Sequence, residues 1–142
     1  MVELRHQNLP TTMKFIKSLF ASTKLFTINS VAAQSFTNGW PQIKFYYEIL
    51  AKSYTASEQG NLSLIKLNSK ILVQKAEELS IEGMPAEYRN PKILETLLTL
   101  KKQTKHLNLL VEGNFPDSEI KLGLIKLYDI FHTIVELCSS KK

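Results

Sequence analysis

The chain has 142 residues, which is enough for one domain but too few for two lobes with a cleft between them. Hydrophobic residues make up 44% of the chain and charged residues 22%, which excludes the disordered and collagen-like classes. The formal net charge is +5, and the single cysteine, Cys138, allows neither an intramolecular disulfide nor a zinc site built on several cysteines.

The excess positive charge is concentrated at the start of the chain. Residues 1–33 contain four basic side chains against Glu3, whereas residues 34–142 contain 14 basic and 12 acidic ones. In this second part lysines are interleaved with acids, and no basic stripe with aromatic residues between the lysines is present. We therefore expect no nucleic-acid partner.

The first 33 residues are typical of an export signal. From Met13 the chain has two lysines, a mostly apolar stretch and then Val31-Ala32-Ala33, whose small side chains suit a signal peptidase. We expect cleavage after Ala33 and a periplasmic or otherwise exported protein, with Met1–Thr12 as an N-terminal extension. Two alternatives remain open, an organellar transit peptide and an amphipathic N-terminal helix of a cytoplasmic protein. No run of 18 apolar residues occurs, so we expect no membrane span.

Residues 34–142 divide at turn signals into four segments, each with apolar residues at helical spacing. Sustained alternation typical of strands is absent from the sequence. We expect four helices, at about Pro41–Thr55, at about Leu62–Ser80, from Pro91 to Gly113 and from Pro116 to about Cys138. Four amphipathic helices with short links predict an all-α domain, folded as an antiparallel up-down-up-down four-helix bundle.

The ends of the third and fourth segments have recognisable signals. Gly113-Asn114 supplies a residue that tolerates the left-handed conformation favoured after a helix. Asp117 or Ser118 can cap the free N–H groups at the start of the last helix.

Each segment has one apolar stripe, which predicts the side that faces the core. The stripe of the first segment is Ile43, Tyr47, Leu50 and Tyr54, and that of the second is Leu62, Ile65, Ser69, Leu72, Ala76 and Leu79. Across the chain we expect core positions for Leu72, Leu97, Leu124 and Phe131. The third stripe is widened by Leu94, Leu98 and Leu110, which leaves a homodimer paired through this segment as an alternative.

Sequence motifs of enzymes are absent. The chain has no glycine-rich phosphate loop, no HExxH, no GxSxG and no pair of ExxH motifs for a di-iron site. Cys138 is the last member of an apolar stripe, and His132, six residues earlier, lies on another face of the helix. We therefore interpret Cys138 as a core residue and expect no enzymatic activity.

His132 is the most informative polar residue of the last segment. Together with Tyr128 and Asp129 it lies at the edge of the apolar stripe. One interpretation makes it a ligand of haem or a metal, with Asp129 as its hydrogen-bond acceptor. The other makes it a partly buried histidine packed beside Tyr128, with no metal site. His106, next to Lys105, is expected in solvent.

The run Tyr128-Asp129-Ile130-Phe131-His132 near the end of the last helix resembles the four-helix cytochromes of the c-prime type and their soluble b-type relatives. In that family a Cys-x-x-Cys-His motif attaches haem covalently, and its histidine is the axial ligand. Here Tyr128 and Phe131 take the cysteine positions, and His132 keeps the ligand position. The resemblance thus excludes covalent attachment and implies, at most, haem b on His132 with Tyr128 and Phe131 beside it.

The sequence therefore predicts a small exported helical-bundle protein that acts as a non-catalytic binding or accessory module without a cofactor. Its partner, a protein or a small molecule, is not specified by any motif. The alternative is a cytochrome-like protein that binds haem or a metal through His132. Absorbance of the purified or haem-titrated protein separates the two.

Overall fold

The computed structural model describes residues 39–139, so the expected leader at residues 1–33 lies outside the described residues. Within residues 39–139 the chain is helical and has no strands, as the sequence predicts. The elements are α2 (Pro41–Glu58), α3 (Ser63–Glu77), the 3₁₀ helix η1 (Ala86–Tyr88), α4 (Pro91–Glu112) and α5 (Asp117–Ser139).

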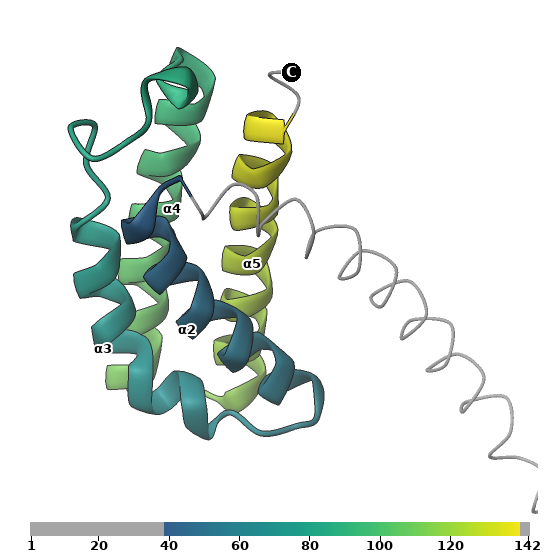
Figure 1. Cartoon of the computed structure of the whole chain (residues 1–142). Coiled ribbons are helices and arrows are strands. Elements are labelled where there is room, and N and C mark those ends of the chain that lie inside the picture. Colours follow the sequence, from purple (N-terminus) through teal and green to yellow (C-terminus); the bar gives the residue numbers. More distant parts are fainter. Residues whose placement is uncertain (1–38, 140–142) are drawn as a thin grey trace, which may run out of the picture.

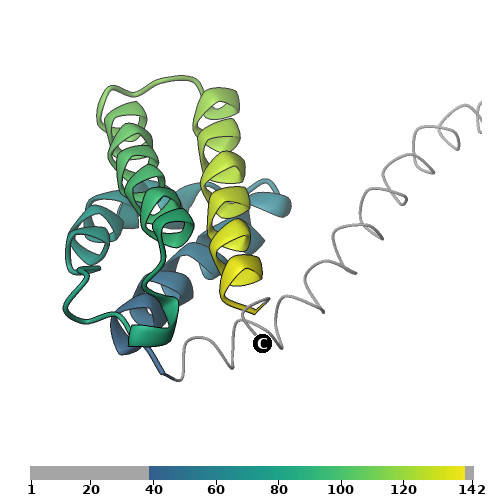
Figure 2. The ribbon, with the colours of Figure 1, turned by 90° about the horizontal axis from the view of Figure 1, so that it is seen from above.

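The helices pack as a bundle. Each contacts the next one along the chain, and α2 also contacts α5, which closes the ring of contacts. The most extensive contact joins α4 to α5, the two longest helices, which lie side by side in both views (Figures 1 and 2). Among residues 39–139, no helix is both long and apolar enough to cross a bilayer.

The helix boundaries follow local signals in the sequence. Pro91 is the first residue of α4, and the side chain of Asn90 caps this helix by accepting a 2.9 Å hydrogen bond from the backbone N–H of Ile93. After α4 the left-handed residue is Asn114, with φ of 54°, whereas Gly113 keeps a negative φ. Gly113-Asn114 therefore ends α4 as predicted, and Asn114 is the residue that takes the left-handed conformation.

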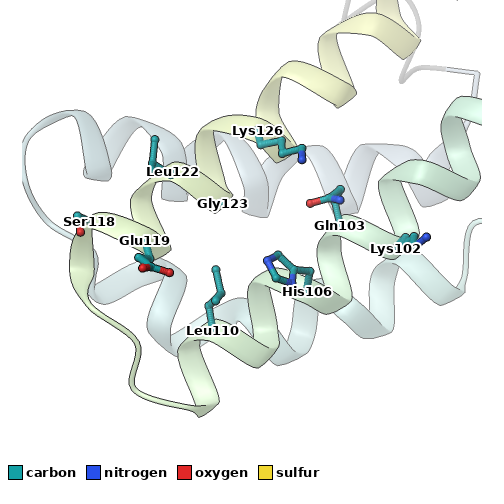
Figure 3. A pocket seen from close by; sticks show the side chains of 9 residues that line it. All are labelled: Lys102, Gln103, His106, Leu110, Ser118, Glu119, Leu122, Gly123 and Lys126. Atoms are coloured by element: carbon teal, nitrogen blue, oxygen red, sulfur yellow. The ribbon is translucent and has the colours of Figure 1, made fainter.

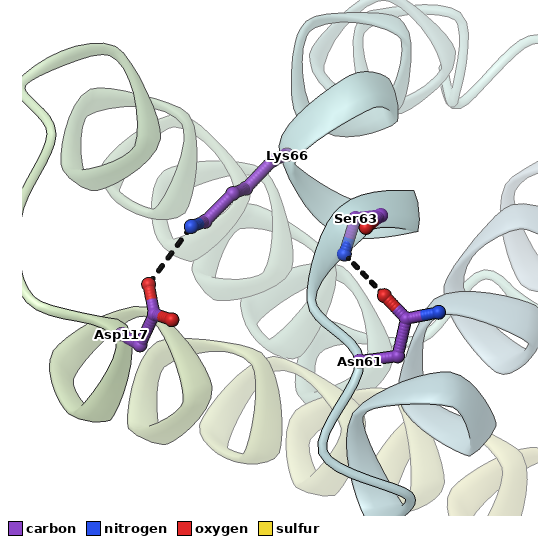
Figure 4. A network of polar contacts seen from close by, with 4 residues as sticks. All are labelled: Asn61, Ser63, Lys66 and Asp117. Atoms are coloured by element: carbon purple, nitrogen blue, oxygen red, sulfur yellow. Dashed lines mark hydrogen bonds and ion pairs between the residues drawn. The ribbon is translucent and has the colours of Figure 1, made fainter.

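The start of α5 differs from the expectation. Asp117 and Ser118 lie inside the helix, and the carbonyl of Pro116 accepts the backbone N–H groups of Glu119 and Ile120. The carboxylate of Asp117 instead accepts a 2.8 Å hydrogen bond from Lys66 of α3 (Figure 4). Both side chains of this pair are exposed, so the pair contributes little to stability.

A similar local contact marks the start of α3. The side-chain oxygen of Asn61 accepts a 2.9 Å hydrogen bond from the backbone N–H of Ser63 (Figure 4). This contact satisfies one of the N–H groups that a helix start leaves free. Before it, Gly60 takes a positive φ of 83° in the link from α2, a conformation that is easy only for glycine.

The core contains most of the residues that the stripes predict. Leu72, Leu97, Leu124 and Phe131 are all buried. All six stripe residues of α3 are buried as well, including Ser69. The periodicity of this segment therefore identified its inner face correctly.

Two stripes needed correction. In α2 the fully buried tyrosine is Tyr46, whereas Tyr47 and Tyr54 are partly buried at the edge of the core. In α4 Leu110 is buried, but Leu98 is 67% exposed and does not belong to the core. Helix α2 also continues to Glu58, beyond the expected end at Thr55, and α3 ends at Glu77, before the expected end at Ser80.

Tyr46 is held by a buried polar contact with α4. Its hydroxyl lies 2.7 Å from Oγ1 of Thr104, and that Oγ1 donates to the carbonyl of Leu100 at 2.7 Å. Because Thr104 uses its proton on the carbonyl, the tyrosine hydroxyl is the donor to Thr104. The contact ties the middle of α2 to the middle of α4 without leaving either hydroxyl unsatisfied.

Candidate functional site

The first candidate site is the surroundings of His132. Tyr128 and His132 lie four residues apart on α5, so they occupy the same side of the helix. Their rings are in contact, with centroids 4.3 Å apart and planes inclined by 57°. His132 is partly buried, as the packing interpretation predicts, while Asp129 is exposed.

Aromatic side chains of α2 pack on this part of α5. The ring of Tyr54 stacks on Tyr128 with centroids 3.9 Å apart, and Tyr47 and Tyr46 flank Phe131 at 5.1 and 6.0 Å. We call this set the ring cluster: Tyr46, Tyr47, Tyr54, Tyr128, Phe131 and His132. It fills the interface between α2 and α5 with stacked rings.

Burial shifts the titration of the ring cluster. It lowers the pKa of His132, because a charged imidazolium is poorly solvated there, although Asp129 and Glu136 oppose the shift. It also raises the pKa of Tyr54 and of Tyr128, since a phenolate is disfavoured in the same surroundings. All three side chains are therefore uncharged at neutral pH, as suits a packed interface.

The residues around His132 do not fit a haem. A porphyrin ligated by His132 needs open space beside the imidazole, and Tyr128 is already in contact with that ring. The ring of Tyr128 also stacks on Tyr54, so Tyr128 is held in place by α2 as well.

The remaining candidates for a reactive or metal-binding site are Cys138 and groups of metal-ligating side chains. Cys138 is buried in the core, as predicted from its position on the stripe. Within the described part of the chain, no three His, Cys, Asp or Glu side chains are grouped closely enough to hold a metal ion. The contacts of the ring cluster are those of a packed interface between two helices.

The second candidate site is a groove along the outer side of α4 and α5, which we call the α4/α5 groove (Figure 3). It has a volume of about 560 Å³, within the range of about 300–1,000 Å³ typical of small-molecule sites. The residues that line it are Lys102, Gln103, His106 and Leu110 of α4, and Ser118, Glu119, Leu122, Gly123 and Lys126 of α5.

Gly123 brings the two helices together beneath this groove. A Cβ atom at position 123 would lie 3.2 Å from the Cδ1 atoms of both Leu107 and Leu110. Glycine inside a helix costs about 1 kcal/mol relative to alanine. The close approach of these two α4 side chains gives a physical reason for glycine at this position.

Charge is distributed unevenly along the groove. Lys126 and Gln103 extend toward one another from the two helices near one end, with Lys102 at the rim (Figure 3). Glu119 lies near the other end, close to the link between the helices. Between them lie His106 and the apolar side chain of Leu110.

The described bundle, residues 39–139, has no net charge. Four of the 18 basic residues precede residue 39 and two follow residue 139, which leaves twelve in residues 39–139 against twelve acidic residues. The net positive charge of the chain therefore resides outside the bundle. A charge pattern in the groove reflects local placement rather than the overall composition.

The sequence alone did not identify this groove. His106 was correctly expected at the surface, but its place beside Lys126 depends on how α4 and α5 pack. One signal was available, because Gly123 interrupts a segment of strong helix formers without ending the helix. A glycine in that position indicates a close approach of two helices.

Comparison with known proteins adds no assignment. No protein-family model matches the chain, and no curated protein or solved structure matches it at a significant level.

Proposed function

We propose that the protein is a small, non-catalytic helical binding module whose binding surface is the α4/α5 groove. The observation that carries this proposal is the groove itself, in which cationic and hydrogen-bonding side chains surround an apolar floor. A few polar groups that converge on an apolar surface are typical of ligand sites. Its partner is accordingly a ligand that combines apolar and polar groups.

The positions of His132 and Cys138 support the proposal that the protein is not a catalyst. His132 packs in the ring cluster and Cys138 is buried, so neither presents a nucleophile or base to a bound substrate. The net charge of zero in residues 39–139 likewise gives no support for a nucleic-acid partner.

The alternative function, haem binding through His132, has less support. The ring of Tyr128, stacked on Tyr54, packs against the imidazole that a haem would need, and covalent attachment lacks its cysteines. We therefore propose that the protein binds no haem and that its resemblance to the cytochromes is limited to the helical pattern and the position of His132.

An NMR fragment screen tests the proposed function. The full chain, labelled with ¹⁵N, is titrated with a mixed library of neutral, anionic and cationic fragments, and backbone amide shifts are mapped. We expect the largest shifts at Gln103, His106, Gly123 and Lys126. Shifts centred on Tyr54, Tyr128 and His132 would contradict the proposal, as would a library without any hit in the groove.

We further propose that the four helices run alternately up and down. Support comes from the four-residue links at residues 59–62 and 113–116, which suit antiparallel neighbours. It also comes from the order of contacts between α2 and α5, where Tyr47 meets Phe131 and Tyr54 meets Tyr128. Nuclear Overhauser effects between the rings of each pair test this arrangement.

Export and assembly belong to the same proposal. Val31-Ala32-Ala33 supports cleavage before Gln34 and a periplasmic or otherwise exported location. A homodimer through α4 has less support, because the exposed Leu98 and Leu109 are separated by Lys102 and Lys105 on the outer side of that helix.

A further inference from the structure

We infer that the α4/α5 groove binds a small carboxylate with an apolar chain, such as a medium-chain fatty acid. This inference rests on the proposed function, because it names the ligand class of the same groove. It follows from three features of the lining: the donors at one end, the apolar surface in the middle and the single carboxylate at the other end.

The donor end suits a carboxylate. Lys126 offers an ammonium group and Gln103 an amide N–H₂, and the two extend toward one another from opposite helices (Figure 3). Lys102 at the rim adds a second positive charge, and His106 adds a ring nitrogen nearby. A carboxylate placed between Lys126 and Gln103 accepts from both and is attracted by two ammonium groups.

The middle of the groove suits an apolar chain. Leu110 of α4 lines the groove and packs against Gly123 of α5, so the two helices form an apolar floor there (Figure 3). Leu122, which is 66% exposed, forms part of the α5 wall. Covering these surfaces with a hydrocarbon chain removes apolar area from water on both partners.

Glu119 sets the direction of the ligand. It lies seven residues before Lys126 on α5, about 10 Å along the helix axis. Its carboxylate repels an anionic head group, so the head lies at the Lys126 end and the chain extends toward Glu119. A cationic amphiphile of the same length can place its head group only beside the single carboxylate of Glu119, so it should bind more weakly than the anionic one.

Titration with three matched amphiphiles tests this inference. Octanoate and octyltrimethylammonium, below their micelle-forming concentrations, and octanol, below its solubility limit, are each added to the ¹⁵N-labelled full chain. Amide shifts in the groove give the dissociation constants. We expect octanoate to bind about tenfold more tightly than either of the other two amphiphiles. This is the gain in affinity expected from two exposed charge pairs, one with Lys102 and one with Lys126.

Charge reversal provides the matched control. Lys102 and Lys126 are both exposed, so the double variant K102E/K126E is expected to fold. It should lose octanoate binding about tenfold or more and gain affinity for octyltrimethylammonium. The control variant K70E/K92E reverses two exposed lysines outside the groove lining and should bind octanoate as the wild type does.

Each contrary result has a definite meaning. Equal binding of the three amphiphiles, or an unchanged octanoate constant in K102E/K126E, overturns the carboxylate inference, while fragment shifts in the groove still support the binding module. Failure of octanoate to bind also overturns it. An acidic amphipathic peptide that binds the groove when octanoate does not would assign the groove to a protein partner instead.

Discussion

The rings of Tyr54 and Tyr128 stack with centroids 3.9 Å apart and planes within 8° of parallel. One ring comes from α2 and the other from α5, so this contact is a direct link between the first and last helices of the described bundle. The ring of Tyr128 also contacts the ring of His132. The packing role of His132 follows from this relationship.

A double-mutant cycle measures the stacking energy. Tyr54→Ala and Tyr128→Ala are each expected to lower the free energy of unfolding, with a coupling energy of about 1 kcal/mol between them. Urea denaturation of the two single variants and the double variant gives this value. The control pair is Tyr54 and Tyr88, because Tyr88 packs near Trp40 at the opposite end of α2 and should be additive with Tyr54. Additivity at Tyr54 and Tyr128 would show that the stack contributes nothing specific.

Two leucines of α5 test the assignment of its inner face. Leu124 is fully buried, so Leu124→Ala should cost about 2–5 kcal/mol through lost transfer energy and a cavity. Leu122 is mostly exposed, and Leu122→Ala should change stability by no more than about 0.5 kcal/mol. Denaturant midpoints of the two variants provide the comparison. Similar losses in both would mean that α5 is rotated from the position described.

His132 makes stability fall in acid. Burial lowers the pKa of His132 in the folded protein, so the folded state favours the neutral ring. Below the unfolded value of about 6.5 the unfolded chain binds the proton more readily, and stability is lost as the pH falls further. His132→Gln should remove this part of the loss between pH 7.5 and 5.5, measured by urea unfolding at each pH. At neutral pH, His132→Ala should cost about 1 kcal/mol. An acid response unchanged in His132→Gln would contradict the assignment.

The buried tyrosines make stability fall in alkali. Burial raises the pKa of Tyr46 far above its ordinary value, although its hydrogen bond with Thr104 opposes the shift. The unfolded chain loses the phenolic proton near pH 10 while the folded protein keeps it, so stability decreases as the pH rises above that value. Absorbance of tyrosinate during a pH titration should show a delayed phase that coincides with unfolding. Titration of all tyrosines near pH 10, with the helices intact, would contradict this result.

Processing of the leader is the remaining prediction. We expect the mature protein to begin at or near Gln34, because Val31-Ala32-Ala33 follows a basic, weakly apolar segment. Mass analysis of the N-terminus of protein isolated from its native host checks the cleavage. Retention of Met1 or Met13 in that material would rule out this cleavage.

Much of the fold was predictable because apolar spacing dominates in these helices. The stripe of α3, from Leu62 to Leu79, was complete even though it includes Ser69. In α2 the buried face also contains Ser53 and Ser57, and these polar residues hid the true stripe, which passes through Tyr46. A pattern of apolar residues cannot reveal a face whose burial depends on small hydroxyl side chains.

The candidate site was only partly predictable. The contact between Tyr128 and His132 was expected because both lie on one helix at i and i+4. The stacking of Tyr54 on Tyr128 required the position of α2 against α5, and the α4/α5 groove required the close approach at Gly123. Contacts between helices depend on their relative register, which no local spacing specifies.

A haem titration followed by absorbance tests most directly the claim that His132 is a packing residue and that ligands bind elsewhere. The wild-type chain and His132→Ala are each titrated with haem under the same conditions. Because the ring of Tyr128 contacts His132 and is itself stacked on Tyr54, we expect no Soret band that depends on this histidine. A Soret band at one haem per chain in the wild type that is lost in His132→Ala would contradict the account.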